Sequence, residues 1–434
     1  EKGMEVFDAA ELWSRERIAE TQLTRLRATL SQARKCAFYR ERLDEAGVTP
    51  DSIRSLDDLQ RIPFTSKQDL RSQYPTGLLC VPPSEIVRMH CSSGTTGTPV
   101  AICHTQNDIN SWADLMARCM HMVGVRRDDV FQNMSGYGLF TGGLGIHFGA
   151  ERLGCMTIPA GPGNSRRQIK LAKDFHTTVA HILPSYALIL GEHLRNMGED
   201  PRAFPLRIAL VGAEPYTEEF RKRIEELFDM KAYNSYGLSE MNGPGVGFEC
   251  LEQKGLHIWE DAYIPEIVDP DTGEPVPDGE VGELVMTSLC RQGMPILRYR
   301  TRDLTFLPGE CACGRAHRRM DRILGRADDM FIIKGVNVYP MQIEQVIMTF
   351  KEVGQSYLIL LENDGIGDVM RVQVEVRDEY FVEDMRALQN LQKVIAQRLR
   401  DEILVTPRVE LVESNSLPRT EGKAVRVQDM RVKK

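Results

Sequence analysis

A loop rich in glycine and hydroxyl residues carries the strongest chemical signal in the sequence. It reads Ser92-Ser93-Gly94-Thr95-Thr96-Gly97-Thr98-Pro99. Glycines let the backbone turn its N–H groups toward an anion, and small hydroxyl side chains add donors without steric bulk. Gly97 is followed by threonine and proline, whereas a P-loop NTPase has lysine followed by serine or threonine. The composition therefore predicts a phosphate-binding loop of another kind, with a polar turn between strands as the alternative.

Four further motifs follow this loop in chain order. They are Tyr236-Gly237-Leu238-Ser239-Glu240, Tyr299-Arg300-Thr301-Arg302-Asp303, Gly325-Arg326-Ala327-Asp328-Asp329 and Leu417-Pro418-Arg419-Thr420-Glu421-Gly422-Lys423. In order and approximate spacing, the five motifs resemble those of the adenylate-forming superfamily, and the likeness extends from about Phe38 to the C-terminus. Within it the chain most resembles the phenylacetate–CoA ligases, through Ile62-Pro63-Phe64-Thr65-Ser66-Lys67, Gly136-Tyr137-Gly138-Leu139-Phe140-Thr141-Gly142-Gly143 and Arg298-Tyr299-Arg300-Thr301-Arg302-Asp303. Ser239 departs from the commoner threonine but keeps the hydroxyl.

The resemblance implies an enzyme that uses ATP to join a carboxylic acid to CoA through an acyl-adenylate, with release of AMP and pyrophosphate. The acid would be small and aromatic, phenylacetate or a related arylacetate. ATP with Mg²⁺ and CoA would be bound, and the resemblance also implies a homodimer. The implied nucleotide contacts are Ser92, Ser93, Gly94, Thr95, Thr96, Gly97, Thr98, Gly212, Ala213, Glu214, Pro215, Tyr236, Gly237, Ser239, Asp303 and Arg326.

The chemistry of individual side chains fits the roles that the resemblance implies. Glu240 would hold Mg²⁺, because a hard cation on phosphate oxygens prefers carboxylate ligands. Asp303 would accept hydrogen bonds from both ribose hydroxyls, Arg326 would reach the ribose, and Tyr236 would lie against the adenine or the adenylate. Lys423 would neutralise charge on the α-phosphate and the attacking carboxylate, so Lys423 and Glu240 are the catalytic candidates. A solvated charge near the C-terminus is the alternative for Lys423.

Two positions after the third motif indicate a domain that moves. Asp328 would be the hinge at which a small domain rotates before the CoA thiol attacks the acyl-adenylate. Gly335 would lie beside the pantetheine arm, where the absence of a side chain keeps a tunnel open. A simple turn before a strand is the alternative for Asp328 and Asp329.

The acyl pocket is expected in the glycine-rich residues 136–145. Five glycines alternate there with apolar and aromatic residues, a composition that could wrap a flat ring. A tightly packed helix start in the core explains the same composition. The expected substrate contacts are Tyr137, Gly138, Phe140, Gly142, Pro184 and Tyr186.

A second metal site is predicted from cysteine and histidine. Cys311-Ala312-Cys313-Gly314 places two thiols in one turn, and Cys250 with His257 offers two more ligands. Three cysteines and one histidine form an accepted structural zinc set, which leaves no open position for catalysis. The Cys-x-Cys spacing is tighter than usual, and two free surface thiols with Cys250 and His257 in the core are the alternative.

Three other functions stay open at this point. The chain could pass the acyl group to an amine or a carrier-protein thiol, act as a phosphotransferase, or be a degenerate nucleotide-binding protein. Retention of Glu240, Asp303, Arg326 and Lys423 argues against degeneration. Release of ADP in place of AMP would identify a phosphotransferase.

The elements that must position these residues alternate along the chain. Short apolar runs at residues 130–131, 156–158, 179–183 and 208–211 predict strands, and residues 165–175, 186–197 and 217–228 predict helices. This alternation is typical of a parallel sheet covered by helices. Residues 280–288 and 297–300 predict additional β structure. An amphipathic helix is predicted over residues 11–46, with Leu23, Leu26, Leu30, Ala33 and Ala37 at helical spacing.

The pattern restarts after residue 329. Strands are predicted near residues 330–333, 356–361, 372–376 and 409–412, and helices near 341–350 and 383–400. The predicted fold class is α/β, with a large N-terminal α/β domain, appended β structure and a small mobile C-terminal α+β domain. We expect residues 1–326 to bind ATP and the acid, and residues 327–434 to form the mobile lid.

Composition restricts the classes of protein further. A chain of 434 residues exceeds what one core usually supports, so two domains are expected. The formal net charge of −8 argues against general affinity for nucleic acid. The sequence contains no run of about 18 apolar residues, so a membrane span is not expected. The ten cysteines are scattered, and the N-terminus lacks the pattern of a secretory signal. The expected location is the reducing cytoplasm.

Overall fold

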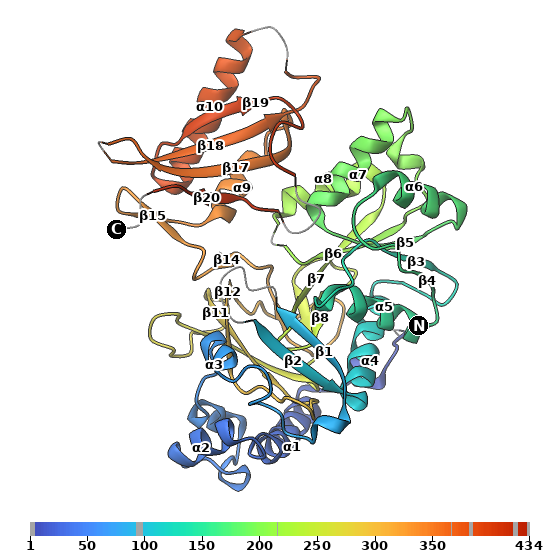
Figure 1. Cartoon of the computed structure of the whole chain (residues 1–434), viewed down its shortest axis with the longest axis vertical. Helices are drawn as coiled ribbons and strands as arrows, with labels where there is room; N and C mark the ends of the chain where they lie inside the picture. Colours follow the sequence, from blue (N-terminus) through green and yellow to red (C-terminus); the bar gives the residue numbers. More distant parts are fainter. Residues whose placement is uncertain are drawn as a thin grey trace.

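The computed structural model describes residues 5–92, 99–214, 216–365, 367–381, 385–419 and 424–431. A large N-terminal domain carries a smaller C-terminal domain over one end, next to helices α7 (Pro184–Asn196) and α8 (Glu218–Phe228) (Figure 1). The α/β class and the two-part organisation predicted from the sequence are confirmed. Within the described ranges, no helix is both long and apolar enough to cross a membrane.

An eight-stranded sheet forms the centre of the large domain, in the order β13-β9-β8-β7-β6-β5-β3-β4. Strands β4, β3, β5, β6 and β7 run parallel, and β8, β9 and β13 continue the sheet in antiparallel pairs. The bounds are β3 Val130–Asn133, β4 Met156–Ile158, β5 Val179–Ile182, β6 Ile208–Gly212, β7 Lys231–Leu238, β8 Gly243–Glu249, β9 Leu256–Ile258 and β13 Arg319–Met320.

Helices connect the parallel strands. They are α5 Thr141–Leu153, α6 Ser165–Asp174, α7 Pro184–Asn196 and α8 Glu218–Phe228. Every residue of β5 and β6 is buried, as expected for parallel strands whose two faces are covered. The Asn164 and Thr217 side chains cap α6 and α8 by accepting from backbone N–H groups of the first turn. The predicted alternation of strands and helices is therefore found.

The glycine-rich segment allows α5 to pack closely on α4 (Gln106–Met122). A Cβ atom at Gly145 would lie 2.3 Å from the Trp112 ring, and one at Gly149 would lie 2.4 Å from the Met116 side chain. Contacts this short do not occur between real side chains, so these glycines are required by the packing. The predicted helix start in the core thus explains part of the segment.

A four-stranded antiparallel sheet and a β hairpin complete the large domain. The sheet has the order β10-β11-β12-β14, with β10 Tyr263–Val268, β11 Gly282–Ser288, β12 Tyr299–Thr305 and β14 Gly325–Arg326. The hairpin pairs β1 Ile86–Ser92 with β2 Val100–Thr105. Helix α3, Lys67–Ser72, follows a residue that pairs with β12, since Thr65 forms a β-bridge with Tyr299 and its carbonyl accepts from Arg300 N–H at 2.9 Å.

The single helix predicted over residues 11–46 is wrong. Two helices occupy the region, α1 Arg15–Ala33 and α2 Ala37–Glu45, because the chain turns between them where Cys36 N–H donates to the Ala33 carbonyl. The turn buries Cys36 and Tyr39 and leaves Ala37 exposed, whereas a continuous helix would have placed Ala37 on the apolar face.

The small domain has a mixed four-stranded sheet in the order β19-β18-β17-β20. The bounds are β17 Val353–Asn363, β18 Asp368–Val376, β19 Arg408–Val412, β20 Val427–Asp429, α9 Pro340–Ile347 and α10 Met385–Ile403. A short hairpin of β15 Phe331–Ile333 and β16 Val336–Val338 precedes it. The predicted α+β character of this region is confirmed.

Polar contacts join the two domains beside α7 and α8. The Arg223 guanidinium donates to the carbonyls of Phe350, Val353 and Gly354 at 2.6–3.0 Å. The buried Glu344 carboxylate accepts from Thr217 N–H at 3.1 Å, next to the start of α8. These bonds hold the small domain in a defined orientation over the sheet.

Replacing Gly145 with alanine should destabilise the large domain. Overpacking against Trp112 costs about 1–3 kcal/mol, which exceeds the gain of about 1 kcal/mol from alanine's helix propensity. Chemical denaturation should therefore give a lower free energy of unfolding. Gly138→Ala is the control, because its Cβ meets no atom within 4 Å and its free energy should be nearly unchanged. Equal stability of the two variants would contradict the packing role of Gly145.

Candidate active site

A cavity of about 180 Å³ lies beyond the carboxyl ends of β6 and β7. This edge is where open parallel sheets bind ligands. The two strand ends approach closely there, since a Cβ on Gly212 would lie 2.3 Å from the Ser235 carbonyl oxygen. The described lining comprises Ala213, Glu214, Tyr216, Asn234, Ser235, Tyr236, Gly237, Leu238, Leu256, Asp303, Met320, Arg322, Ile323 and Arg326.

The motif residues Tyr236, Asp303 and Arg326 meet at this cavity. The Tyr236 hydroxyl donates to Asp303 Oδ2 at 2.6 Å, and Arg326 Nη1 donates to Asp303 Oδ1 at 2.9 Å. The second contact follows from strand register, because Asp303 of β12 pairs with Arg326 of β14. Burial, followed by the charge of Asp303, raises the pKa of Tyr236 well above its usual value, so this tyrosine stays a hydrogen-bond donor.

Arg326 also connects the cavity to the predicted hinge. Its Nε and Nη2 donate to the two carboxylate oxygens of Asp328 at 2.8 and 2.9 Å. Burial alone would lower the pKa of Arg326, but the hydrogen bond to Asp328 and the charge of Asp303 raise it, so the guanidinium stays charged. Asp328 itself is exposed, at the point where the chain leaves β14 for the small domain.

The predicted magnesium ligand Glu240 is buried at the turn after β7. Its Oε1 accepts from the Tyr299 hydroxyl at 3.1 Å, and its backbone carbonyl accepts from Arg291 Nη1 at 2.7 Å. Burial and the neighbouring Glu240 charge raise the pKa of Tyr299 well above its usual value. Ser239 lies close to the first residue of α5, with 3.4 Å between its Oγ and Thr141 Oγ1. The Tyr236-to-Glu240 motif therefore extends from this cavity to the start of α5.

Two of the segments that distinguish the predicted branch contact each other. The Arg298 guanidinium lies over the Phe64 ring, 4.1 Å from its centroid, and Arg300 lies 5.4 Å away. Thr65 Oγ1 donates to the Leu297 carbonyl at 2.6 Å. Residues 62–67 therefore support β12, the strand that presents Asp303.

Glu214 connects the cavity with both α7 and the C-terminal tail. Its Oε1 accepts from Ser185 N–H at 2.7 Å in the first turn of α7, where a carboxylate is favoured by the helix dipole. Its Oε2 accepts from Ala424 N–H at 3.0 Å. Ala424, which follows Lys423 in the chain, therefore contacts a residue that lines the cavity.

Several predicted nucleotide contacts lie outside the described residues. These are Ser93, Gly94, Thr95, Thr96, Gly97, Thr98 and Pro215, together with Lys423. Ser92 is described as the last residue of β1.

The predicted acyl-binding residues divide between two parts of the large domain. The Tyr137 hydroxyl lies 3.1 Å from His147 Nδ1, and burial raises the pKa of Tyr137 to about 12. A Cβ at Gly138 would meet nothing within 4 Å, whereas one at Gly142 would strike the Phe140 ring at 2.4 Å. Pro184 begins α7, and the Tyr186 hydroxyl lies 3.0 Å from Ser165 Oγ.

Gly335 occupies the turn between β15 and β16. Lys334 and Gly335 both have positive φ values, 50° and 78°, as tight hairpin turns of this kind require. The turn alone therefore favours glycine at this position.

Leu256, Met320, Arg322 and Ile323 line the cavity but were not predicted from the sequence. They belong to β9, β13 and the segment that follows, and they carry no motif. Only the pairing of Leu256 with Met320 across the sheet brings them to the cavity. The Arg322 guanidinium contributes by donating to the Tyr216 carbonyl at 2.9 Å.

Comparison with known proteins agrees with this architecture. The family model described as AMP-binding enzyme matches residues 20–290, and the AMP-binding enzyme C-terminal domain matches residues 335–431. The chain therefore belongs to the AMP-binding enzymes. Phenylacetate-coenzyme A ligase from Thermus thermophilus is 47% identical, over 96% of this chain and 97% of the relative. The Escherichia coli ligase of the same name is 44% identical over 98% of each chain, so this chain belongs to the phenylacetate–coenzyme A ligase family.

Solved structures of another ligase in two reaction states agree with this chain to different degrees. 2-Hydroxyisobutyryl-CoA ligase in its postadenylation state aligns with a TM-score of 0.91 and 30% identity, over 97% of this chain and 91% of that one. The same ligase in the thioesterification state aligns with a TM-score of only 0.71, at 31% identity over 98% and 92%. The whole chain, with its small domain included, therefore agrees better with the postadenylation structure than with the thioesterification structure.

Replacing Asp303 with asparagine should weaken ATP binding. The change removes the charge that holds Arg326 and leaves a poorer acceptor, and hydrogen bonds to charged groups contribute about 1.5–3 kcal/mol. Titration calorimetry should therefore give a dissociation constant for ATP about 10- to 100-fold higher than that of the unchanged protein. Asp44→Asn, which alters an exposed pair with Arg34, should bind ATP normally. Unchanged affinity in Asp303→Asn would contradict the role of this carboxylate.

Proposed function

We propose that the chain is an ATP-dependent, AMP-forming ligase that joins phenylacetate or a related arylacetate to CoA through an acyl-adenylate. The observation that carries this proposal is the meeting of Tyr236, Asp303 and Arg326 at one cavity beside the sheet. Relatives named phenylacetate-coenzyme A ligase, 43–47% identical over nearly the whole chain, support the class of reaction.

In the proposed complex, the nucleotide occupies the cavity beyond β6 and β7. The adenine lies along Gly212 and Ala213, next to Tyr236, and the ribose hydroxyls donate to Asp303. Glu240 and ATP phosphate oxygens would bind Mg²⁺, which would supply positive charge to the phosphates. Glu240 fits this role because it is a carboxylate whose Oε1 is already oriented by Tyr299.

In the first half-reaction, an oxygen of the substrate carboxylate attacks the α-phosphorus of ATP. A new P–O bond forms, the bond to pyrophosphate breaks, and the products are acyl-adenylate and pyrophosphate. No protein base is needed, because the acid is already ionised near neutral pH. We assign charge neutralisation in this step to Lys423. The bond from Ala424 to Glu214 supports this assignment, since Ala424 follows Lys423 in the chain and Glu214 lines the cavity.

In the second half-reaction, the CoA sulfur attacks the acyl carbonyl carbon. A C–S bond forms, the C–O bond to the phosphate breaks, and the thiol proton is lost as AMP departs. The proposal places the hinge at Asp328, between domains of residues 1–326 and 327–434, and brings Gly335 to the pantetheine arm. The lower similarity to the thioesterification structure supports a rotation before this step.

The acid is assigned to the surroundings of Tyr137, Gly138, Phe140 and Gly142, with Pro184 and Tyr186 as a further wall. The open space at Gly138 supports contact with a flat ring, because an added side chain there would meet no protein atom.

The proposal also includes a homodimer and a location in the cytoplasm. In that reducing compartment, the described cysteines would stay free thiols or metal ligands. Any zinc held by Cys250, His257, Cys311 and Cys313 would be structural, since four protein ligands close the site.

The acid preference is testable with a panel of substrates. Phenylacetate, ring-substituted phenylacetates, indoleacetate, benzoate and hexanoate are compared by CoA-dependent release of AMP and formation of thioester. We expect arylacetates to exceed hexanoate at least tenfold in kcat/KM, about 1.4 kcal/mol, because an aromatic-lined pocket favours a ring. AMP without thioester would indicate another acceptor, ADP would indicate a phosphotransferase, and preference for hexanoate would contradict the pocket.

Replacing Lys423 with alanine should separate the two half-reactions. We expect acid-dependent exchange of pyrophosphate into ATP to fall at least about 100-fold, because the lysine acts on the developing charge only during adenylation. Thioester formation from supplied phenylacetyl-adenylate and CoA should fall less than about threefold, a change small enough to exclude loss of a transition-state charge contact. Lys351→Ala, in the same domain, serves as the control for loss of a lysine charge. Equal losses in both half-reactions would contradict the assignment.

A further inference from the structure

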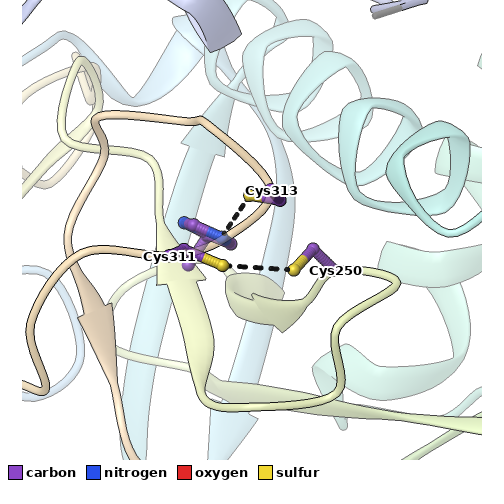
Figure 2. Close-up of side chains that lie close together, drawn as sticks. Cys250, Cys311 and Cys313 are labelled. Carbon is purple, nitrogen blue, oxygen red and sulfur yellow. Dashed lines mark hydrogen bonds between the residues drawn. The ribbon is translucent and has the colours of Figure 1, made fainter.

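Four potential metal ligands from two distant segments meet beside the central sheet. The ligand atoms of Cys250, His257, Cys311 and Cys313 all lie within 4.8 Å of one another. Cys250 follows β8, His257 is the middle residue of β9, and both are buried. Figure 2 shows the three cysteine side chains directed toward one another, with Cys311 and Cys313 on one loop.

The separations of these atoms match a tetrahedral zinc site. Metal–ligand bonds of about 2.3 Å to sulfur and about 2.0 Å to nitrogen place two sulfurs about 3.8 Å apart, and sulfur and nitrogen about 3.5 Å apart. The Sγ atoms of Cys250 and Cys311 are 3.7 Å apart, and Cys313 Sγ lies 3.3 Å from His257 Nε2. A disulfide would need about 2.05 Å between the sulfurs, so Cys250 and Cys311 are not bonded to each other.

The turn geometry explains how the tight Cys-x-Cys spacing delivers both thiols to one point. Gly314 N–H donates to the Cys311 carbonyl at 3.1 Å, which closes a turn around the exposed Ala312. Gly314 has a φ of 82°, a conformation that glycine adopts without cost. The two cysteine side chains thus lie on the sheet side of the turn.

The environment of His257 is suited to a metal ligand. Its Nδ1 lies 3.1 Å from the His317 carbonyl oxygen, to which only a protonated Nδ1 can donate. In neutral imidazole this leaves the lone pair on Nε2, the atom that faces Cys313. A backbone carbonyl that fixes the tautomer in this way is typical of histidine ligands.

We propose that Cys250, His257, Cys311 and Cys313 bind one Zn²⁺, and that this ion fixes the wall of the nucleotide cavity formed by Leu256 and Met320. Three thiolates and one imidazole in tetrahedral geometry select zinc among the common divalent metals. The site is closed and structural. Its second role, support of the cavity wall, depends on the proposed function of that cavity.

The link to the cavity passes through two short strands. β13 contains only Arg319 and Met320, and pairs with β9 as Arg319 to His257 and Met320 to Leu256. Leu256, next to the ligand His257, and Met320 both line the cavity. Residues 306–318, which lead into β13, form neither helix nor strand, so the ion would order a loop that has little secondary structure of its own.

The same loop also holds the N-terminal segment. The buried Arg315 guanidinium donates to Glu11 Oε2 at 2.8 and 3.1 Å. His317 Nε2 lies 2.8 Å from the Ala10 carbonyl oxygen, and Arg15 donates to the Ala316 carbonyl at 2.9 Å. Loss of the ion would therefore loosen contacts on both sides of the loop.

Metal analysis of the purified full-length protein tests the site without relying on activity. Protein produced with zinc in the medium and purified without chelator should contain about one zinc per chain by plasma mass spectrometry. Cobalt-exchanged protein should show thiolate-to-cobalt charge transfer and the intense visible bands of a tetrahedral ion. Less than about 0.2 zinc per chain overturns the proposal, because a four-ligand site should stay filled during purification.

Variants assign the ligands. Cys311→Ser with Cys313→Ser should lose zinc, whereas Cys155→Ser should retain about one ion, because the Cys155 thiol is outside the four-ligand cluster and donates to the Arg126 carbonyl. If the double variant does not fold, a mercurial thiol reagent applied to the unchanged protein should release one equivalent of zinc to a chromogenic chelator. Zinc retained in the double variant, or no release, overturns the assignment.

The support of the cavity wall has its own test. Calorimetry should show ATP binding weakened about tenfold in zinc-depleted protein and restored by added zinc. Without the ion, Leu256 and Met320 would be displaced and would no longer fit against the adenine ring. Equal ATP affinity with and without zinc overturns the positioning role. Absence of ATP binding to the zinc-loaded protein would instead contradict the proposed function, while the metal content would still decide whether the site exists.

Discussion

The Asp303 carboxylate is the contact on which the arrangement of the site depends. It accepts from Tyr236 of β7 and from Arg326 of β14, so one side chain joins the central sheet, the second sheet and the exit to the small domain. Arg326 in turn binds Asp328, where we place the hinge. A ribose bound to Asp303 would therefore contact the same arginine that orients the hinge. Nucleotide binding and domain rotation would be coupled through a single guanidinium.

The parts of the fold that could be predicted are those with strong local patterns. Apolar runs such as residues 208–211 became fully buried parallel strands, because both faces of such strands are covered. β8 could not be recognised, since its sequence Gly243-Pro244-Gly245-Val246-Gly247-Phe248-Glu249 carries residues that weaken isolated strands. There the tertiary packing decides, and Gly245, with a φ of 97°, fits against Met116 of α4. The turn at Cys36 was missed for a similar reason, because burial of Tyr39 outweighs helix continuity.

In the candidate site too, residues with a local sequence pattern could be predicted, whereas residues that tertiary packing brings in could not. The motifs that resemble those of the adenylate-forming superfamily identified Tyr236, Asp303 and Arg326, and the structure brings these three side chains together. Leu256 and Met320 were missed, since ordinary apolar side chains reach the cavity only through strand pairing. Residue type alone predicted a zinc site from Cys250 with His257 and Cys311 with Cys313, although more than fifty residues separate these two pairs. Their convergence in the structure follows from the position of the Cys311 loop beside β9.

The most direct test of the account follows the oxygen atoms of the acid. Phenylacetate labelled with oxygen-18 in both carboxyl positions is converted with ATP and CoA in unlabelled water, and the released nucleotide is analysed by mass spectrometry. If the carboxylate attacks the α-phosphorus and CoA then displaces the adenylate, each AMP formed must carry one labelled oxygen. Unlabelled AMP, or a label found in inorganic phosphate beside ADP, would contradict an acyl-adenylate and with it the proposed function.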